Sequence, residues 1–199
     1  MTRIKSAFEK AMERIEQIKA PDPVEKLEWE FVPLGRKLAG SYMKFQGDPF
    51  KKFTNSTDEA KPYLKKGMIE VLIANIQLPK NENIDATNKR SFEGLTILLQ
   101  EYQPSKDLLE RAIYVTQQYI QYGNPQREQA YFDLKKQIEQ VVIEALSRQG
   151  GGAHPQAAGN IRVETMPEFQ QQWMKISGQI DHQYEQHLDQ IRQELINLP

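Results

Sequence analysis

The sequence of 199 residues contains no cysteine. This absence excludes a disulfide framework, a thiolate zinc site and a cysteine nucleophile, and it is consistent with a reducing compartment. The sequence also lacks an excess of either charge, because 26 Lys and Arg face 27 Asp and Glu, for a net charge of -1. Overall charge therefore points to no class of partner.

No run of apolar residues is long enough to span a membrane. The longest, Met68 to Leu78, is interrupted by Glu70, Asn75 and Gln77 and falls far short of the roughly 20 residues that a bilayer requires. Residues 1–20 carry a charge every few positions, so they lack the apolar core of a signal peptide. We therefore expect a soluble, cytoplasmic protein with no membrane contact.

Apolar residues recur at three- and four-residue spacing along most of the chain, which is typical of amphipathic helices. We predict an all-α fold, a multi-helix bundle of about six to seven helices with short, proline-marked connections. The first predicted helix ends at Pro21, and its apolar stripe consists of Ile4, Ala7, Phe8, Ala11, Met12, Ile15 and Ile18.

The start of the second helix is marked by three residues. Asp22 is a natural N-cap, Pro23 suits the first helical position, and Glu25 occupies the capping-box position. Pro33 lies inside the same helix and cannot donate a backbone hydrogen bond, so we expect a kink or a break there.

Two later stretches are expected to interrupt the helices. Gln46 to Asn55 is polar and is predicted to be a loop. Gly123, Asn124 and Pro125 form a C-terminal glycine, an N-cap and a first-turn proline in succession, which predicts the end of one helix and the start of another.

The clearest boundary is the glycine-rich stretch Gln149 to Asn160, whose composition is that of a flexible linker. We predict a helical bundle over 1–148, a linker over 149–165 and a long amphipathic helix over 166–199. The stripe of that helix suits packing on the bundle or on another chain, and the sequence leaves both open. The candidate partner-binding residues are Trp173, Ile176, Ile180, Tyr184, Ile191 and Leu195.

The most chemical-looking cluster lies on the C-terminal helix and comprises Asp181, His182, Glu185, His187 and Asp189. The three acids share one side of a helix, but the two histidines lie about 140° apart and cannot easily bind one ion. A solvated helix face is the favoured interpretation. We find no catalytic residues, metal ligands or cofactor motif, and the sequence favours a protein that is not an enzyme.

The region from Arg36 to Lys66 is rich in basic and aromatic side chains, which can contact phosphates and stack on bases. Tyr42 and Phe45 fall on the predicted core stripe, whereas Phe50 and Phe53 lie in the predicted loop. Trp29 and Trp173 are both expected to pack in the core. The candidate anion-binding residues are Lys51, Lys52, Lys65 and Lys66.

Four stretches together resemble a family of bacterial proteins of about two hundred residues whose function is unknown. They are IKSAFEKAMER at Ile4 to Arg14, GRKLAGSYMKF at Gly35 to Phe45, LIANIQLP at Leu72 to Pro79, and EF followed by W and Y…L at Glu168 to Leu188. The resemblance implies a bacterial, cytoplasmic, helical protein and carries over no activity, ligand or site residue.

The favoured hypothesis for function is a noncatalytic intracellular interaction or assembly protein. It would form a homo-oligomer or bind a protein partner through its C-terminal helix. One alternative is anion or nucleic-acid binding through the basic region from Arg36 to Lys66, with nucleic acid the weaker case. Another alternative is a small molecule bound in a pocket between helices.

Overall fold

The computed structural model describes residues 22–100, 102–148 and 162–198, and over these the chain is helical with no strand. The predicted all-α fold is confirmed. The chain divides into two compact units, residues 1–68 and 69–199. The predicted first helix and most of the glycine-rich linker lie outside the described residues. Among the described helices, none is long and apolar enough to cross a membrane.

In the first unit, α2 (Pro23–Met43) begins as the sequence predicts. The side chain of Asp22 accepts a hydrogen bond from the Val24 amide at 3.0 Å, and the Asp22 amide donates to Glu25 Oε2 at 3.2 Å. This capping box satisfies amides that have no partner within the helix. Pro33 lies inside α2, so the helix continues through it rather than starting there.

Two glycines let α2 approach α4 (Lys61–Ala74) closely. A Cβ atom at Gly35 would lie less than 3.0 Å from the carbonyl oxygen of Leu64, and one at Gly67 would lie equally close to the carbonyl oxygen of Val32. Each helix therefore presents a glycine to the backbone of the other, and neither position has room for a side chain.

The end of α2 differs from the predicted core stripe at Phe45. The Gln46 amide donates to the Ser41 carbonyl at 2.9 Å and the Phe45 amide to the Tyr42 carbonyl at 3.0 Å, which is the Schellman pattern that ends a helix. Phe45 takes the left-handed position with φ 57° and is 78% exposed. The prediction that it belongs to the core is wrong, because the backbone turns outward before its side chain.

A short helix that the sequence analysis missed, α3 (Pro49–Thr54), lies within the stretch predicted to be a loop. The side chain of Asp48 accepts from the Lys51 amide at 3.0 Å, so the Asp-Pro signal that starts α2 is repeated here. Phe50 packs edge-on against Tyr42, with ring centroids 5.0 Å apart. Trp29 is 67% exposed, and the expectation that it packs in the core is wrong.

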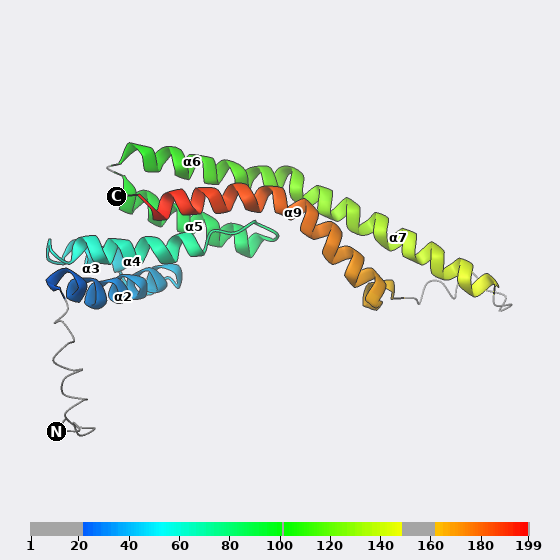
Figure 1. Ribbon diagram of the computed structural model, residues 1–199, viewed down its shortest axis with the longest axis horizontal. Helices are drawn as coiled ribbons and strands as arrows, with labels where there is room; N and C mark the ends of the chain where they lie inside the picture. Colours follow the sequence, from blue (N-terminus) through cyan, green and yellow to red (C-terminus); the bar gives the residue numbers. More distant parts are fainter. Residues whose placement is uncertain (1–21, 101, 149–161, 199) are drawn as a thin grey trace, which may run out of the picture. The chain divides into compact units, whose positions relative to one another are not determined.

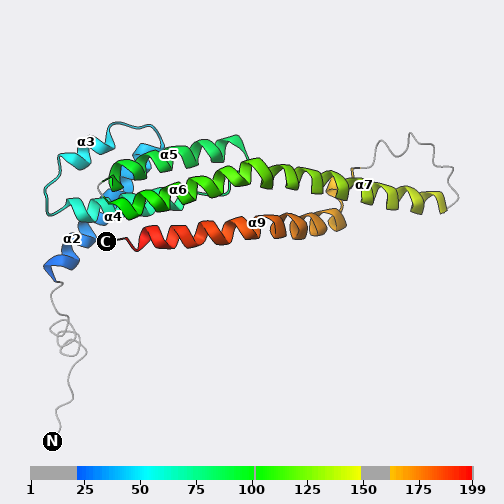
Figure 2. The same cartoon turned by 90° about the horizontal axis from the view of Figure 1, so that it is seen from above.

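The second unit is an antiparallel arrangement of long helices (Figures 1 and 2). α6 and α7 run in one direction, and α9 runs back in the opposite direction beside both of them. The elements after α4 are α5 (Glu82–Leu99), α6 (Gln103–Gln118), the π-helical turn η1 (Tyr119–Gly123), α7 (Asn124–Arg148), the 3₁₀ turn η2 (Val163–Thr165) and α9 (Pro167–Ile196).

The boundary predicted at Gly123 is present, since η1 ends at Gly123 and α7 begins at Asn124, but the chain does not leave the helical conformation there. A Cβ atom at Gly123 would lie 2.6 Å from the ring of Tyr119, so glycine here makes room for a buried aromatic ring. Asn124 does not cap a helix but donates its side-chain amide to the Pro79 carbonyl at 2.8 Å.

The long C-terminal helix packs in cis. Leu188, Ile191 and Leu195 are at most 2% exposed, and α9 packs along both α6 and α7. At the other end of α9, Phe169 joins Leu134 and Val163 in a separate small core. The alternative that the sequence left open is thereby resolved in favour of the chain's own core.

A non-helical segment, Ile76 to Lys80, connects α4 to α5 and is held by side chains from three helices. Asn88 of α5 accepts from the Gln77 amide at 2.9 Å and donates to the Gln77 carbonyl at 2.6 Å. Arg192 of α9 donates through Nε to the Ile76 carbonyl at 3.1 Å. Together with the Asn124 contact, these bonds satisfy backbone groups that no regular helix or sheet could satisfy.

The close approach of α2 and α4 makes a prediction about glycine. Gly35→Ala and Gly67→Ala should each destabilise the protein by about 1–3 kcal/mol, because the new methyl group must push two backbones apart. Gly40→Ala in the same helix should instead stabilise by roughly 0.5 kcal/mol, since nothing lies within 4 Å of its Cβ position. Urea unfolding of the three variants measures the difference, and equal effects at all three positions would contradict the close packing.

Candidate functional site

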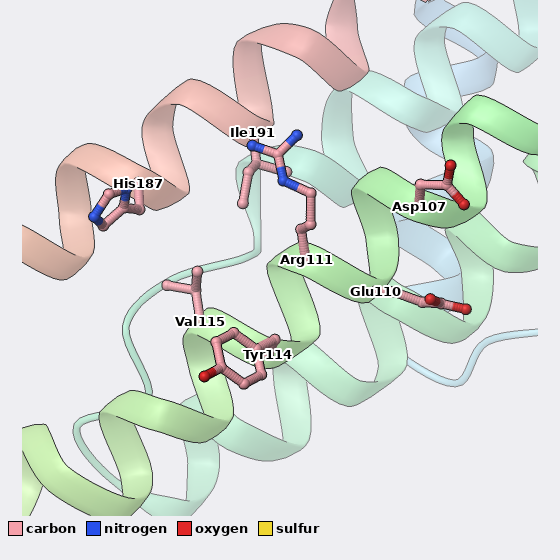
Figure 3. Close-up of a pocket in the computed structure, with 7 residues that line it drawn as sticks. All are labelled: Asp107, Glu110, Arg111, Tyr114, Val115, His187 and Ile191. Atoms are coloured by element: carbon pink, nitrogen blue, oxygen red, sulfur yellow. The ribbon is translucent and has the colours of Figure 1, made fainter.

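The candidate ligand site is a groove between α6 and α9, shown in Figure 3. Its volume is about 580 Å³, and it is open to solvent along one side. Ile191 is buried and supplies an apolar floor, and Val115 lies beside it. The remaining lining residues are Asp107, Glu110, Arg111, Tyr114 and His187.

Arg111 reaches from α6 across the groove toward α9 (Figure 3). Its guanidinium forms an ion pair with Glu194 at 3.1 Å. Tyr114 is 60% exposed, so one face of its ring is open to a ligand or to another protein. The groove offers an aromatic wall, an apolar floor and charges of both signs, but no nucleophile paired with a base.

A second polar site surrounds Asp181 on α9. Its carboxylate pairs with Arg127 of α7 at 2.6 Å and with Lys80 at 2.7 Å, and it accepts a hydrogen bond from the Tyr119 hydroxyl at 2.7 Å. The Asp181 side chain is 14% exposed, and Tyr119 is fully buried. Tyr184 packs edge-on against the Tyr119 ring at 5.2 Å.

The surroundings of Asp181 shift two pKa values in opposite senses. Burial alone would raise the pKa of Asp181, but the hydrogen bonds from Lys80 and Tyr119 and the charge of Arg127 outweigh it, and the pKa is lowered from 3.8. Burial, followed by the hydrogen bond to Asp181, raises the pKa of Tyr119. Asp181 is therefore ionised and accepts the hydrogen bond, and Tyr119 is a neutral phenol that donates it.

The ion pairs and the hydrogen bond of Asp181 link four parts of the second unit: α7, α9, η1 and the segment before α5. The expected solvated face is therefore wrong for Asp181, although His182 and His187 are exposed. Glu185 and Asp189 are both ion-paired with Arg192. Over the residues the structure describes, no group of three or more histidines and acids could hold a metal ion.

The structure places the six candidate partner-binding residues against the chain itself. Ile191 and Leu195 are buried, and the other four are half-buried. Trp173 packs on Tyr131 of α7 at 5.2 Å and lies under the guanidinium of Arg127 at the same distance. The stripe therefore packs on α6 and α7, and binding of a partner through these residues stays a prediction.

The four candidate anion-binding lysines lie on two helices, α3 and α4. Lys51 and Lys52 are exposed on α3, and Lys65 is half-buried on α4. Lys66 is ion-paired with Glu28. Anion binding through this region stays a prediction, and the contact of Phe50 with Tyr42 removes one of the two rings that were expected to stack on a base.

The end of α7 is a surface that the sequence analysis did not single out. The apolar stripe of α7 is covered as far as Leu134 and Ile138, where it meets the small core around Phe169. Beyond this point α7 continues past the start of α9 (Figures 1 and 2). Val141, Ile143 and Leu146 are 61%, 38% and 39% exposed.

The polar cluster and the α7 end were missed for different reasons. Lys80, Tyr119 and Arg127 are far from Asp181 in sequence, and no spacing rule connects them. The α7 end carried a signal, because Val141, Val142 and Ile143 are three consecutive apolar residues and cannot all face one side of a helix.

The Asp181 cluster predicts a pH-dependent loss of stability. Asp181→Asn should lower the free energy of unfolding by about 2 kcal/mol at neutral pH, because it removes the negative charge that pairs with Arg127. The folded-state pKa is lowered, so this contribution is present above the unfolded pKa and is lost as the pH falls through the folded value. Urea unfolding should show the variant converging on the wild type in acid. Asp189→Asn, whose side chain is 59% exposed, is the control and should cost little.

Comparison with known proteins gives a family without a function. No curated protein and no solved structure matches the chain. A model of a family of unknown function, DUF6657, matches residues 50–197, which include α3 to α9, the groove and the Asp181 cluster. The resemblance to a family of unknown function is confirmed, and the chain belongs to DUF6657.

Proposed function

We propose that this protein is a noncatalytic interaction protein that binds another protein through the end of α7. The observation that supports the proposal is the exposure of Val141, Ile143 and Leu146 on a helix that extends past α9. At about 100° per residue, Val141 and Ile143 point to nearly opposite sides. A helix that is apolar on several sides is normally buried, so the α7 end is suited to being covered.

The chemistry of the rest of the described chain favours binding over catalysis. Asp181 pairs with Lys80 and Arg127 and accepts the hydrogen bond of the Tyr119 hydroxyl. Neither Asp181 nor Tyr119 is therefore available as a general acid, a general base or a nucleophile. Exposed apolar surface on a helix commonly marks a protein interface. We place the activity in the bacterial cytoplasm, a proposal that rests on the absence of cysteine and on the sequence resemblance.

The test is site-specific photocrosslinking in the native cell. A benzophenone amino acid at position 146 or 141 should give a covalent adduct of higher mass on irradiation, because the partner covers both side chains. The control position is Gln172, which is exposed on α9 and should give none. If positions 141 and 146 yield no more adduct than Gln172, the α7 end has no partner and the proposal fails.

A second candidate function is supported by the groove between α6 and α9. Its volume of about 580 Å³ lies within the range of small-molecule sites, roughly 300–1,000 Å³. The buried Ile191 and the exposed Tyr114 provide an apolar floor and a wall. Under this proposal the protein binds a small molecule with an apolar or aromatic part, and Arg111 contributes a charge at the rim.

A metabolite panel screened by thermal shift tests the second candidate. A compound that binds the folded state alone should raise the melting temperature of the wild type in proportion to its affinity. Tyr114→Ala should abolish the shift, whereas Tyr122→Ala should keep it, because Tyr122 is similarly exposed but does not line the groove. A shift that survives Tyr114→Ala would place the ligand elsewhere.

A further inference from the structure

We propose that the ligand of the groove between α6 and α9 is a small organic cation, an ammonium group joined to an apolar body. The proposal rests on the second candidate function and names the chemical class of its ligand. Three features of the groove carry it: an excess of carboxylates, an exposed aromatic ring beside them, and a buried apolar floor.

The groove has an excess of negative charge. Among the described residues that line it, Arg111 is the one lysine or arginine, and its guanidinium is paired with Glu194 at 3.1 Å. Asp107 and Glu110 also line the groove, and over the described part of the chain neither carboxylate forms an ion pair. Asp107 accepts one long hydrogen bond from Gln103 Nε2, at 3.4 Å. Two carboxylates therefore remain after Glu194 has compensated the charge of Arg111.

The carboxylates and the aromatic ring lie on one side of α6. Glu110 follows Asp107 by three residues and precedes Tyr114 by four, and side chains at these spacings are neighbours on a helix. Tyr114 is 60% exposed. Figure 3 shows the guanidinium of Arg111 turned toward α9 and away from Glu110 and Tyr114. An ammonium group can therefore contact the Glu110 carboxylate and the face of the Tyr114 ring together, and both contacts favour a cation.

The apolar body of the ligand has a place in the same groove. Ile191 of α9 is 2% exposed and forms the floor, and the half-buried Val115 lies beside it. Val115 directly follows Tyr114, so a chain or ring that begins at the Tyr114 side chain reaches this floor. Burial of the body drives binding, and the charge of the head group selects among molecules with similar bodies.

The same residues disfavour a ligand with a negative charge. Such a ligand would compete with Glu194 for Arg111 and would approach the carboxylates of Asp107 and Glu110. Like charges repel one another at this range. Of three ligands with the same body, the groove should therefore bind the cation most tightly, the neutral molecule less tightly and the anion least.

The test compares three compounds with a common phenylethyl body: phenylethylamine, phenylethanol and phenylpropionate. Each is titrated into the isotope-labelled full chain up to about 10 mM, a dissociation constant expected for ligands of this size, and the amide resonances are followed. The amine should bind more tightly than the acid by about fivefold or more, with the alcohol between them. The shifted resonances should be those of α6 around Glu110 and Tyr114 and those of α9 around Ile191.

Two variants with opposite expected effects test the origin of the preference. Glu110→Gln should weaken binding of the amine by about two- to fivefold and leave binding of the alcohol unchanged. Arg111→Gln should instead tighten binding of the amine, because it removes a positive charge and releases Glu194. The control is Glu128→Gln, which changes the net charge equally at an exposed position of α7 outside the groove and should have no effect.

Each other outcome overturns the inference. Equal affinity for the three compounds, lost in Tyr114→Ala, would show that the groove binds apolar molecules without selecting a cation, and the second candidate function would stand. An equal effect of Glu110→Gln and Glu128→Gln would assign the preference to the net charge of the chain. If none of the three compounds binds, or if the amine shifts resonances of other helices alone, the inference fails and the metabolite panel decides the second candidate function by itself.

Discussion

The second unit depends on one buried amide. The side chain of Asn88, 1% exposed, forms hydrogen bonds with both the amide and the carbonyl of Gln77, and so fixes the non-helical segment between α4 and α5. An unsatisfied buried backbone group costs about 1–3 kcal/mol, so this segment is stable only where such partners exist. Once it is fixed, its neighbouring carbonyls are in place for Arg192 and Asn124.

The same contacts hold α9 against the other helices of the second unit. Arg192 ties the C-terminal half of α9 to the fixed segment, and Asp181 ties its middle to Lys80 and Arg127. Both tethers are polar and geometrically specific, and they set the register in which the apolar stripe packs on α6 and α7. The part of α7 that α9 does not reach keeps Val141, Ile143 and Leu146 exposed.

Local sequence predicted much of the fold and little of the site. The capping box at Asp22 and the helical spacing of the apolar residues follow from short-range rules, and the structure agrees. The predictions that failed concern residues whose roles are set by tertiary contacts rather than by neighbouring sequence. Gly123 ends η1, but it accommodates the Tyr119 ring in a chain that stays helical. No spacing pattern could have placed Lys80 beside Asp181, because 101 residues separate them.

We expect Asn88 to hold the second unit together through the non-helical segment between α4 and α5. Hydrogen exchange of Asn88→Leu tests it directly, with Asn83→Leu, an exposed asparagine of the same helix, as the control. We expect the Gln77 amide and the amides of α7 and α9 to lose protection together, because Asn124 of α7 and Arg192 of α9 are hydrogen-bonded to the segment. Loss of protection at Gln77 alone, with α7 and α9 unchanged, would contradict the account.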